Sequence, residues 1–381
     1  MTGSDFFHER IGCSSRCLSG RCGRGHAAGR HPRLATCGSQ SCHSSVMKRG
    51  LQFAVALFVC TAVAVACNIP VFRFALERWK PDSCEVIVFH DQPLTTDDEA
   101  VIAELETASL AKGGVSNLNI IRCDLRTSED QELDSLWLTT KEKASAQLPF
   151  VVARSLKGQN KTINHWHGTL PQLKSTGMLA SPARMELTKR LQNSDAIVWL
   201  VLKSSSDDAQ NKTVVELLRK QCKELPNRVE LPEGIGLPGS ELFSEMPLLI
   251  QFSVLEIDRS DPKEQYLVQQ LSGFQSQAVA ADEPLVVPIF GRGRALEVIP
   301  ASQLNEDLVF ELTEFLCGAC SCQVKEQNPG FDLLLSTNWN VALFGEDAEG
   351  PPPGAAAGNG QKKTAELVPI PSGRKKQSLP K

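Results

Sequence analysis

The residues best placed to do chemistry are Cys317, Cys320 and Cys322, which fall within six positions of one another. A Cys-x-x-Cys pair forms a small redox ring or supplies two thiolates to one metal ion. Cys322 would then resolve a mixed disulfide or add a third thiolate. Because soft thiolates select Cu(I) or Zn²⁺, copper and zinc are the cofactors that the sequence suggests.

The same cysteines also fit a purely structural role. In an oxidising compartment Cys317 and Cys320 would bond to each other, or one of them would bond to Cys222 or Cys123. Such a bridge would fasten the end of a helix. The structural, redox and metal interpretations all remain open at this point.

His165 and His167 are weaker metal candidates. Alternate residues of a strand face the same side, so both imidazoles are expected to point toward one ion. No third ligand can be assigned, and a pair of solvent-facing histidines is the alternative. His90 and Asp91 end another predicted strand, where α/β folds commonly bind ligands. No complete catalytic set occurs, which favours a protein that is not an enzyme.

Composition argues against a nucleic-acid partner. The 381 residues carry a net charge of −4, and aromatic residues make up 6%. A chain without a basic excess has little attraction for phosphate backbones, and scarce aromatic rings leave little surface for stacking bases.

A targeting segment is predicted over residues 47–67. Met47-Lys48-Arg49 precedes an apolar run, Leu51–Ala66, and Cys67 follows directly. Positive charges, an apolar core and small residues before the cut are typical of a secretory signal peptide. The run, about 16 residues long, is shorter than the roughly 20 that span a bilayer. A cleaved signal, a lipoprotein acylated on Cys67 and an uncleaved anchor are the alternatives, and all place the body in the cell envelope on the extracytoplasmic face, with the membrane as a partner.

The two ends of the chain are not expected to fold. Residues 1–46 are basic and rich in Gly, Ser and Arg, which indicates a spurious or disordered extension; a metal-binding role for their scattered Cys and His is the alternative. Residues 345–381 are a Pro/Gly-rich and then basic tail that lacks the apolar surface needed to order it. Residues 323–344 form a C-terminal extension of the body.

Between these ends the apolar pattern alternates between strand and helix periods. The predicted strands of the first stretch are Glu85–His90, Asn117–Cys123, Pro149–Arg154 and Thr162–Trp166, and its helices are Asp98–Lys112, Ser128–Ala146 and Thr169–Thr176. The order recurs in the strands Ala196–Lys203, Pro247–Ile257, Pro284–Phe290 and Ala295–Ile299 and the helices Lys212–Glu224, Pro262–Gly273 and Ser302–Leu316. A helix from Ser181-Pro182 to Gln192 separates the two, and residues 225–246 read as an insertion.

This β-α-β-α-β-β-α order resembles the thioredoxin fold, in which a proline, often cis, opens the third strand. Pro149 and Pro284 stand at those places. The resemblance covers roughly residues 83–320 and implies an α/β protein with two tandem thioredoxin-like units, at 83–178 and 195–322, joined by a bridging helix at 179–194.

The resemblance also implies where chemistry should be missing. A redox-active thioredoxin has Cys-x-x-Cys where its first strand runs into its first helix, but those places here read His90-Asp91-Gln92-Pro93 and Ser204-Ser205-Ser206-Asp207. Without a thiolate there, disulfide exchange has no nucleophile. We therefore expect a non-catalytic module that binds or assembles a protein partner, with a thiol oxidoreductase or a copper- or zinc-handling protein as the alternative. The chain also resembles secreted and lipoprotein-type proteins of bacteria, which implies a compartment and no activity.

Overall fold

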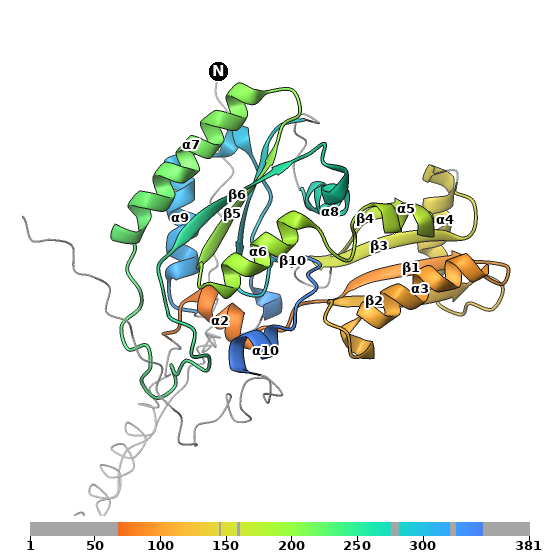
Figure 1. The fold of residues 1–381 in the computed structure, drawn as a ribbon, viewed down its shortest axis with the longest axis horizontal. Helices are drawn as coiled ribbons and strands as arrows, with labels where there is room; N and C mark the ends of the chain where they lie inside the picture. The colour runs from red at the N-terminus through yellow and green to blue at the C-terminus, as the bar shows by residue number, and fades with distance from the viewer. Residues whose placement is uncertain (1–67, 145, 158–160, 276–281, 321–324, 346–381) are drawn as a thin grey trace, which may run out of the picture. The chain divides into compact units, whose positions relative to one another are not determined.

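A computed structural model describes residues 68–144, 146–157, 161–275, 282–320 and 325–345 (Figure 1). They form a mixed α/β body, as predicted. Several predicted features lie outside these ranges: the extension 1–46, the targeting segment 47–67 with Cys67, the residue Cys322 and most of the tail. Among the described residues no helix combines the length and the apolar character that crossing a bilayer requires.

The first half of the body follows the predicted order of elements. It consists of β1 (Cys84–His90), α3 (Thr96–Ala108), the short 3-10 helix η1 (Leu110–Lys112), β2 (Leu118–Asp124), α4 (Gln131–Ala144), β3 (Phe150–Lys157), β4 (Lys161–Gly168) and α5 (Leu170–Ser175). Its strands lie side by side in the order β2-β1-β3-β4. β1 and β2 are parallel, whereas β3 runs antiparallel to both β1 and β4.

Local sequence signals set the helix boundaries in this half. Thr95 caps α3, because its side chain accepts from the Asp98 N–H while Asp98 accepts from the Thr95 N–H. Gly113 ends η1 with a φ of 85°, a backbone conformation that glycine adopts without a steric penalty. The Leu148–Pro149 peptide bond, ahead of β3, is cis.

The second half repeats the order with small departures. After α6 (Pro182–Gln192) come β5 (Ile197–Lys203), α7 (Asp208–Glu224), η2 (Leu225–Asn227), β6 (Phe252–Asp258), η3 (Pro262–Glu264), α8 (Gln265–Phe274), β7 (Leu285–Phe290), β8 (Arg294–Ala295), β9 (Ile299–Pro300), η4 (Ala301–Gln303) and α9 (Glu306–Cys317). β5 pairs in parallel with β6 and antiparallel with β7, and β7 pairs with β9 on its far side.

Two predictions for this half were inexact. The strand expected from Pro247 begins only at Phe252. The strand expected at Ala295–Ile299 is divided into β8 and β9, which pair with opposite ends of β7. Pro288 stands in the middle of β7, and a proline has no N–H for the ladder, so pairing on that side is interrupted there.

The two halves are joined by elements that the sequence did not reveal. These are α2 (Val71–Arg78), η5 (Lys325–Gln327), β10 (Phe331–Asp332) and α10 (Trp339–Phe344). β10 lies between the halves and pairs with β3 on one side and β8 on the other. The described strands thus form one mixed sheet whose main path runs β2-β1-β3-β10-β8-β7-β5-β6, with β4 beside β3 and β9 beside β7.

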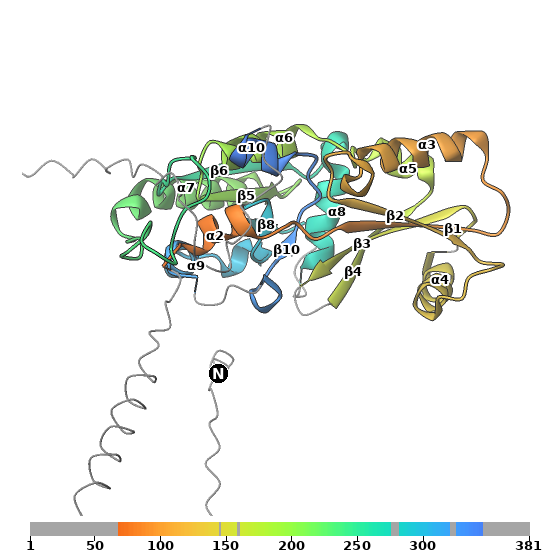
Figure 2. The ribbon, with the colours of Figure 1, turned by 90° about the horizontal axis from the view of Figure 1, so that it is seen from below.

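Helices cover both faces of this sheet (Figure 2). In the second half, α2, α7 and α9 pack on one face, and α6, α8 and α10 pack on the other. In the first half, α3 and α5 cover one face and α4 covers the other. Because α8 also sends Tyr266 into the core of the first half, the apolar cores of the halves meet there.

Candidate functional site

The cysteine cluster lies in the core, not at the surface. Cys317 is the last residue of α9, and its exposed fraction is 1%, while that of Cys320 is 2%. The segment between them is held against the start of α2: the Cys320 N–H donates to the Ile69 carbonyl at 2.9 Å, and Gly318 accepts from the Val71 N–H at 3.0 Å. The position of Cys322 lies outside the described residues.

This burial makes the Cys317 sulfur a poor nucleophile. Burial raises the pKa of Cys317 to about 12, and only a thiolate attacks disulfides or binds metal well. Cys317, Cys222 and Cys123 also carry free thiols. The structural bridges considered from the sequence, which needed Cys317, Cys222 or Cys123 as a partner, are therefore not formed among the described residues.

The expectation that His165 and His167 face the same side is wrong. The pairing of β3 with β4 shifts at Ala153/Arg154: Ala153 is opposite Trp166, but Arg154 is opposite Asn164, which leaves His165 as the extra residue of a bulge. A bulge breaks the alternation of side chains. His165 consequently turns into the core, whereas His167 is exposed and contacts Phe150 on the opposite face, with ring centroids 5.9 Å apart.

His165 joins a buried polar group contributed by both halves. Its Nε2 lies 3.1 Å from the Ser155 hydroxyl and 3.9 Å from the Cys84 sulfur. The Cys84 sulfur is in turn 2.9 Å from the hydroxyl of Tyr266, which comes from α8. Gln270, also of α8, donates to the Ser155 hydroxyl at 3.4 Å.

Burial keeps this group uncharged. It lowers the pKa of His165 to about 3, and it raises the pKa of the Cys84 thiol and that of the Tyr266 hydroxyl. The imidazole, the thiol and the phenol are therefore neutral at neutral pH. Neutral, mutually hydrogen-bonded groups in a core fix how two surfaces meet, and we assign this cluster to joining α8 to the first half.

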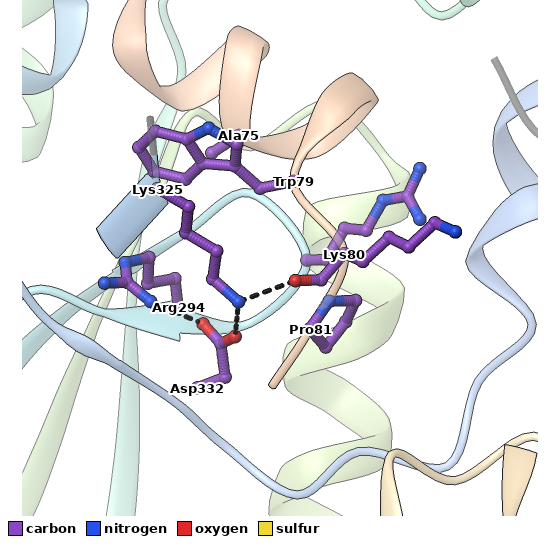
Figure 3. Close-up of a pocket in the computed structure, with 8 residues that line it drawn as sticks. Ala75, Trp79, Lys80, Pro81, Arg294, Lys325 and Asp332 are labelled. Carbon is purple, nitrogen blue, oxygen red and sulfur yellow. Dashed lines mark hydrogen bonds and ion pairs between the residues drawn. The ribbon is translucent and has the colours of Figure 1, made fainter. Parts of the chain in front are cut away.

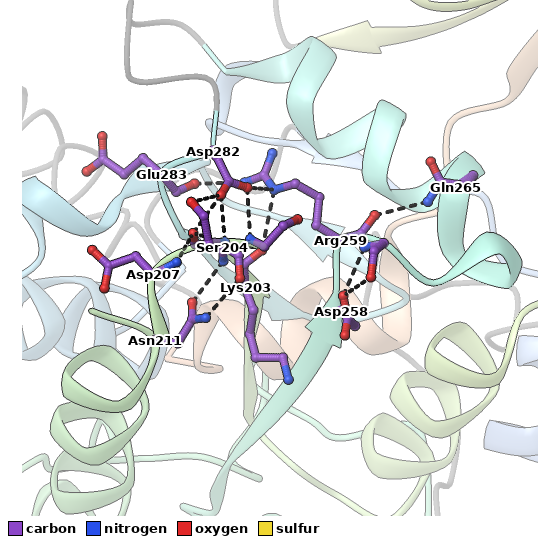
Figure 4. Close-up of polar contacts among 12 residues, drawn as sticks. Lys203, Ser204, Asp207, Asn211, Asp258, Arg259, Gln265, Asp282 and Glu283 are labelled. Atoms are coloured by element: carbon purple, nitrogen blue, oxygen red, sulfur yellow. Dashed lines mark hydrogen bonds and ion pairs between the residues drawn. The ribbon is translucent and has the colours of Figure 1, made fainter. Parts of the chain in front are cut away.

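The most distinctive polar arrangement lies where β5 runs into α7 (Figure 4). There the Asp282 carboxylate accepts from the Ser205 N–H at 2.9 Å and from the Ser206 N–H at 2.9 Å. It also accepts from the hydroxyls of Ser204 and Ser206, at 2.8 and 2.6 Å. Arg259 lies 3.6 Å from the same carboxylate.

The flanking residues fix this loop in place. Asn211 of α7 accepts from the Ser204 N–H at 2.8 Å and donates to the Ser204 carbonyl at 2.9 Å. Asp207 caps α7 by accepting from the Gln210 N–H at 2.9 Å. The loop corresponds to the predicted redox position of the second half, and its hydrogen-bond donors point at an internal carboxylate. No sequence pattern marks Asp282 as part of this site, because its partners are 76 to 78 positions away.

The counterpart loop in the first half is open. His90 ends β1, and its Nδ1 lies 3.0 Å from the Gln92 carbonyl. Asp91 and Gln92 are exposed. Neither His90 nor Asp91 is part of a metal-binding cluster, because no group of three or more His, Cys, Asp or Glu residues suited to a metal occurs among the described residues.

Asp282→Asn should lower the melting temperature at neutral pH and make the melting temperature depend less on pH. The hydrogen bonds from Ser205, Ser206 and Ser204 hold the pKa of Asp282 well below its usual range. A carboxylate whose pKa is lower in the folded chain than in the unfolded chain stabilises the fold at pH values above its unfolded pKa of about 3.9. This contribution is lost as the pH falls through the folded pKa. Thermal unfolding across the acidic range should show the two proteins converging at low pH. Asp91→Asn, in the open loop, is the control and should change little; equal behaviour of both variants would contradict the assignment.

A second charged cluster lies between the halves (Figure 3). Asp332 of β10 accepts from Arg294 at 3.0 Å and from Lys325 at 2.5 Å, and Lys325 also pairs with Asp82 at 2.7 Å. The adjoining cavity, lined in part by Trp79, has a volume of only about 10 Å³, room for about one water molecule and far too little for an organic ligand. Since these cations are already paired with carboxylates, we assign the cluster to fastening β10 in place.

Comparison with known proteins adds no relative to this picture: no protein-family model matches the chain, and no similar curated protein is found.

Proposed function

We propose that this chain is an exported or membrane-tethered protein whose body is a tandem thioredoxin-like module that binds or assembles other proteins without catalysis. The strand orders β2-β1-β3-β4 and β6-β5-β7-β9 support the resemblance. In each half the first two strands are parallel, are joined through a helix, and are followed by an antiparallel strand.

The main support for a role without catalysis is the loop before α7, whose backbone N–H groups already have a hydrogen-bond partner. In a redox-active thioredoxin this loop presents a thiolate at the helix N-terminus. Here the backbone N–H groups of Ser205 and Ser206 are directed at Asp282, and the side chains of the loop are hydroxyls and a carboxylate. The carboxylate beside these hydroxyls is a weak base, because the same hydrogen bonds hold the pKa of Asp282 well below its usual range. A hydroxyl that lacks an effective base is a weak nucleophile, so neither electron transfer nor acyl transfer is favoured.

The chain's entry into the body supports the tether. Residue 67 is followed at once by Asn68, Ile69 and Pro70, which are already hydrogen-bonded or paired to Ser240, Cys320 and Ala319. These contacts at the residues that follow the predicted targeting segment are compatible with an exported domain behind it.

Thiol chemistry tests the non-catalytic assignment. The purified protein, pulsed with iodoacetamide at neutral pH, should leave Cys84, Cys222 and Cys317 unmodified until denaturant is added, because burial raises the pKa of each thiol. Peptide mass spectrometry reads out each site separately. In a disulfide-reductase assay the protein should show no turnover, and Cys320→Ser should behave like the parent.

The alternative function predicts the opposite results. An oxidoreductase built on Cys317, Cys320 and Cys322 would show rapid labelling of at least one of them and turnover that Cys320→Ser abolishes. A copper- or zinc-handling protein would contain stoichiometric metal that the same substitution releases. Cys123→Ser is the matched control, since its thiol is buried in the other half. Membrane flotation and the mass of the mature N-terminus test the tether independently of these thiols.

A further inference from the structure

The turn at residues 234–240 lies where the chain enters the folded body. The Asn68 N–H donates to the Ser240 hydroxyl at 2.9 Å. Asn68 Nδ2 and Leu237 Cδ1 both approach Gly234, at 3.2 and 3.5 Å from the point where a β-carbon would stand. The first described residue of the chain is therefore a direct neighbour of this turn.

The turn presents an apolar, uncharged tip. Leu237 has an exposed fraction of 61%, which is high for a leucine, and Pro238 beside it is also exposed. The sequence from Gly234 to Ser240 (Gly-Ile-Gly-Leu-Pro-Gly-Ser) contains no charged residue. An uncharged loop with a projecting leucine suits the boundary between lipid headgroups and acyl chains, where apolar side chains are buried and charges are costly.

The turn is also held in a fixed shape. The Leu237 N–H donates to the Gly234 carbonyl at 3.2 Å, the Ser240 N–H donates to the Leu237 carbonyl at 2.8 Å, and the Gly236 N–H donates to the Ser240 carbonyl at 2.8 Å. These bonds hold Leu237 at the outer end of the turn, so little ordering remains to be done when it meets a surface.

The residue that contacts this turn directly follows the predicted targeting segment in the chain. Residue 67 is one peptide unit, about 3.8 Å between α-carbons, from Asn68. Ile69 accepts from the Cys320 N–H at 2.9 Å and the Val71 N–H donates to Gly318 at 3.0 Å, which prevents the entering chain from swinging away. From this juxtaposition we propose that the turn at residues 234–240 rests on the lipid surface, with Leu237 inserted into it, when the body is tethered. This inference rests on the proposed tether.

Tryptophan quenching by brominated lipid tests the contact. The full chain carrying Leu237→Trp is reconstituted in phosphatidylcholine vesicles with or without bromine on the acyl chains. Apolar groups at an interface lie about 5–10 Å into the headgroup and acyl boundary, close to the bromines, so the fluorescence added by L237W should fall about twofold in brominated vesicles. The native tryptophans are buried, and the unsubstituted chain supplies their background.

Leu138→Trp is the matched control. Leu138 has the same exposed fraction, 61%, but lies on α4 in the first half. Its added fluorescence should not respond to bromine. If the protein floats with vesicles and L237W is not quenched, the turn does not touch lipid, although the tether stands; a protein docking there would give this result. Equal quenching of both variants would also overturn the contact. If the protein does not float at all, the tether and this inference fail together.

Discussion

Phe331→Ala should lower the free energy of unfolding by about 3–5 kcal/mol, the usual cost of truncating a buried phenylalanine. Phe331 is 1% exposed, and its ring stacks on that of Phe274 with centroids 3.6 Å apart and planes 3° from parallel. The residue also supplies the backbone of β10, which pairs with Lys157 of β3 and Ala295 of β8. The cavity would open at the point where the two halves meet, so the loss should act on their connection.

Urea unfolding followed by circular dichroism measures this effect. Phe315→Ala is the matched control: Phe315 is an aromatic residue on α9 with 43% of its surface exposed, and surface substitutions usually change stability by less than about 0.5 kcal/mol. The loss in F331A should also appear as separate unfolding of the two halves, which trypsin digestion would detect as two fragments. A variant as stable as F315A would show that β10 does not hold the halves together.

His165→Gln should flatten the dependence of stability on pH between about 6.5 and 3. Burial lowers the pKa of His165 to about 3, whereas an unfolded histidine titrates near 6.5. The unfolded chain therefore binds a proton in this window that the folded chain refuses. The contribution of the neutral imidazole is fully present above a pH of about 6.5 and declines by up to about 1.4 kcal/mol per pH unit as the medium is acidified.

Chemical denaturation at a series of acidic pH values measures this slope. His167→Gln is the control on the same strand, because that imidazole is exposed on the opposite face. The unsubstituted protein and H167Q should share the steep slope, and H165Q should lose it. A slope in H165Q equal to that of the parent would mean that His165 is solvated and that the bulge does not bury it.

Most helices and strands could be predicted because the spacing of apolar residues within a short segment is enough to indicate them. The strand predicted at Glu85–His90 and the helix predicted at Asp98–Lys112 both occur, as β1 and as α3 followed by η1. α2 and β10 were not found from the sequence. α2 is only eight residues long, shorter than the roughly 11 to 18 residues over which a helical period can be recognised, and the two residues of β10 are too few for any pattern.

The polar sites were harder to foresee than the elements. The expectation for His165 failed because one extra residue in β4 reverses the direction of its side chain, and a bulge leaves no signature in the pattern of side chains alone. Asp282 could not be identified because its hydrogen bonds reach across the fold to the Ser204–Ser206 loop. Contacts between distant segments can be predicted only when the strand order is known, and the chemistry of a site can be inferred only from those contacts.

The insertion of β10 between β3 and β8 has a consequence for how the protein behaves in a crowded compartment. Without that strand, the hydrogen-bonding groups that Phe331 satisfies on Lys157 and Ala295 would lack their partner, and unpaired strand edges invite other chains to add to them. The described edge strands are β2 and β6, at the ends of the main path, together with β4 and β9, which pair only with β3 and β7. β2 and β6 carry charged residues such as Arg122 and Glu256. Charge at an outer edge discourages such addition. The short strand thereby shields the interior of the sheet from self-association, while the charges on β2 and β6 protect those two edges.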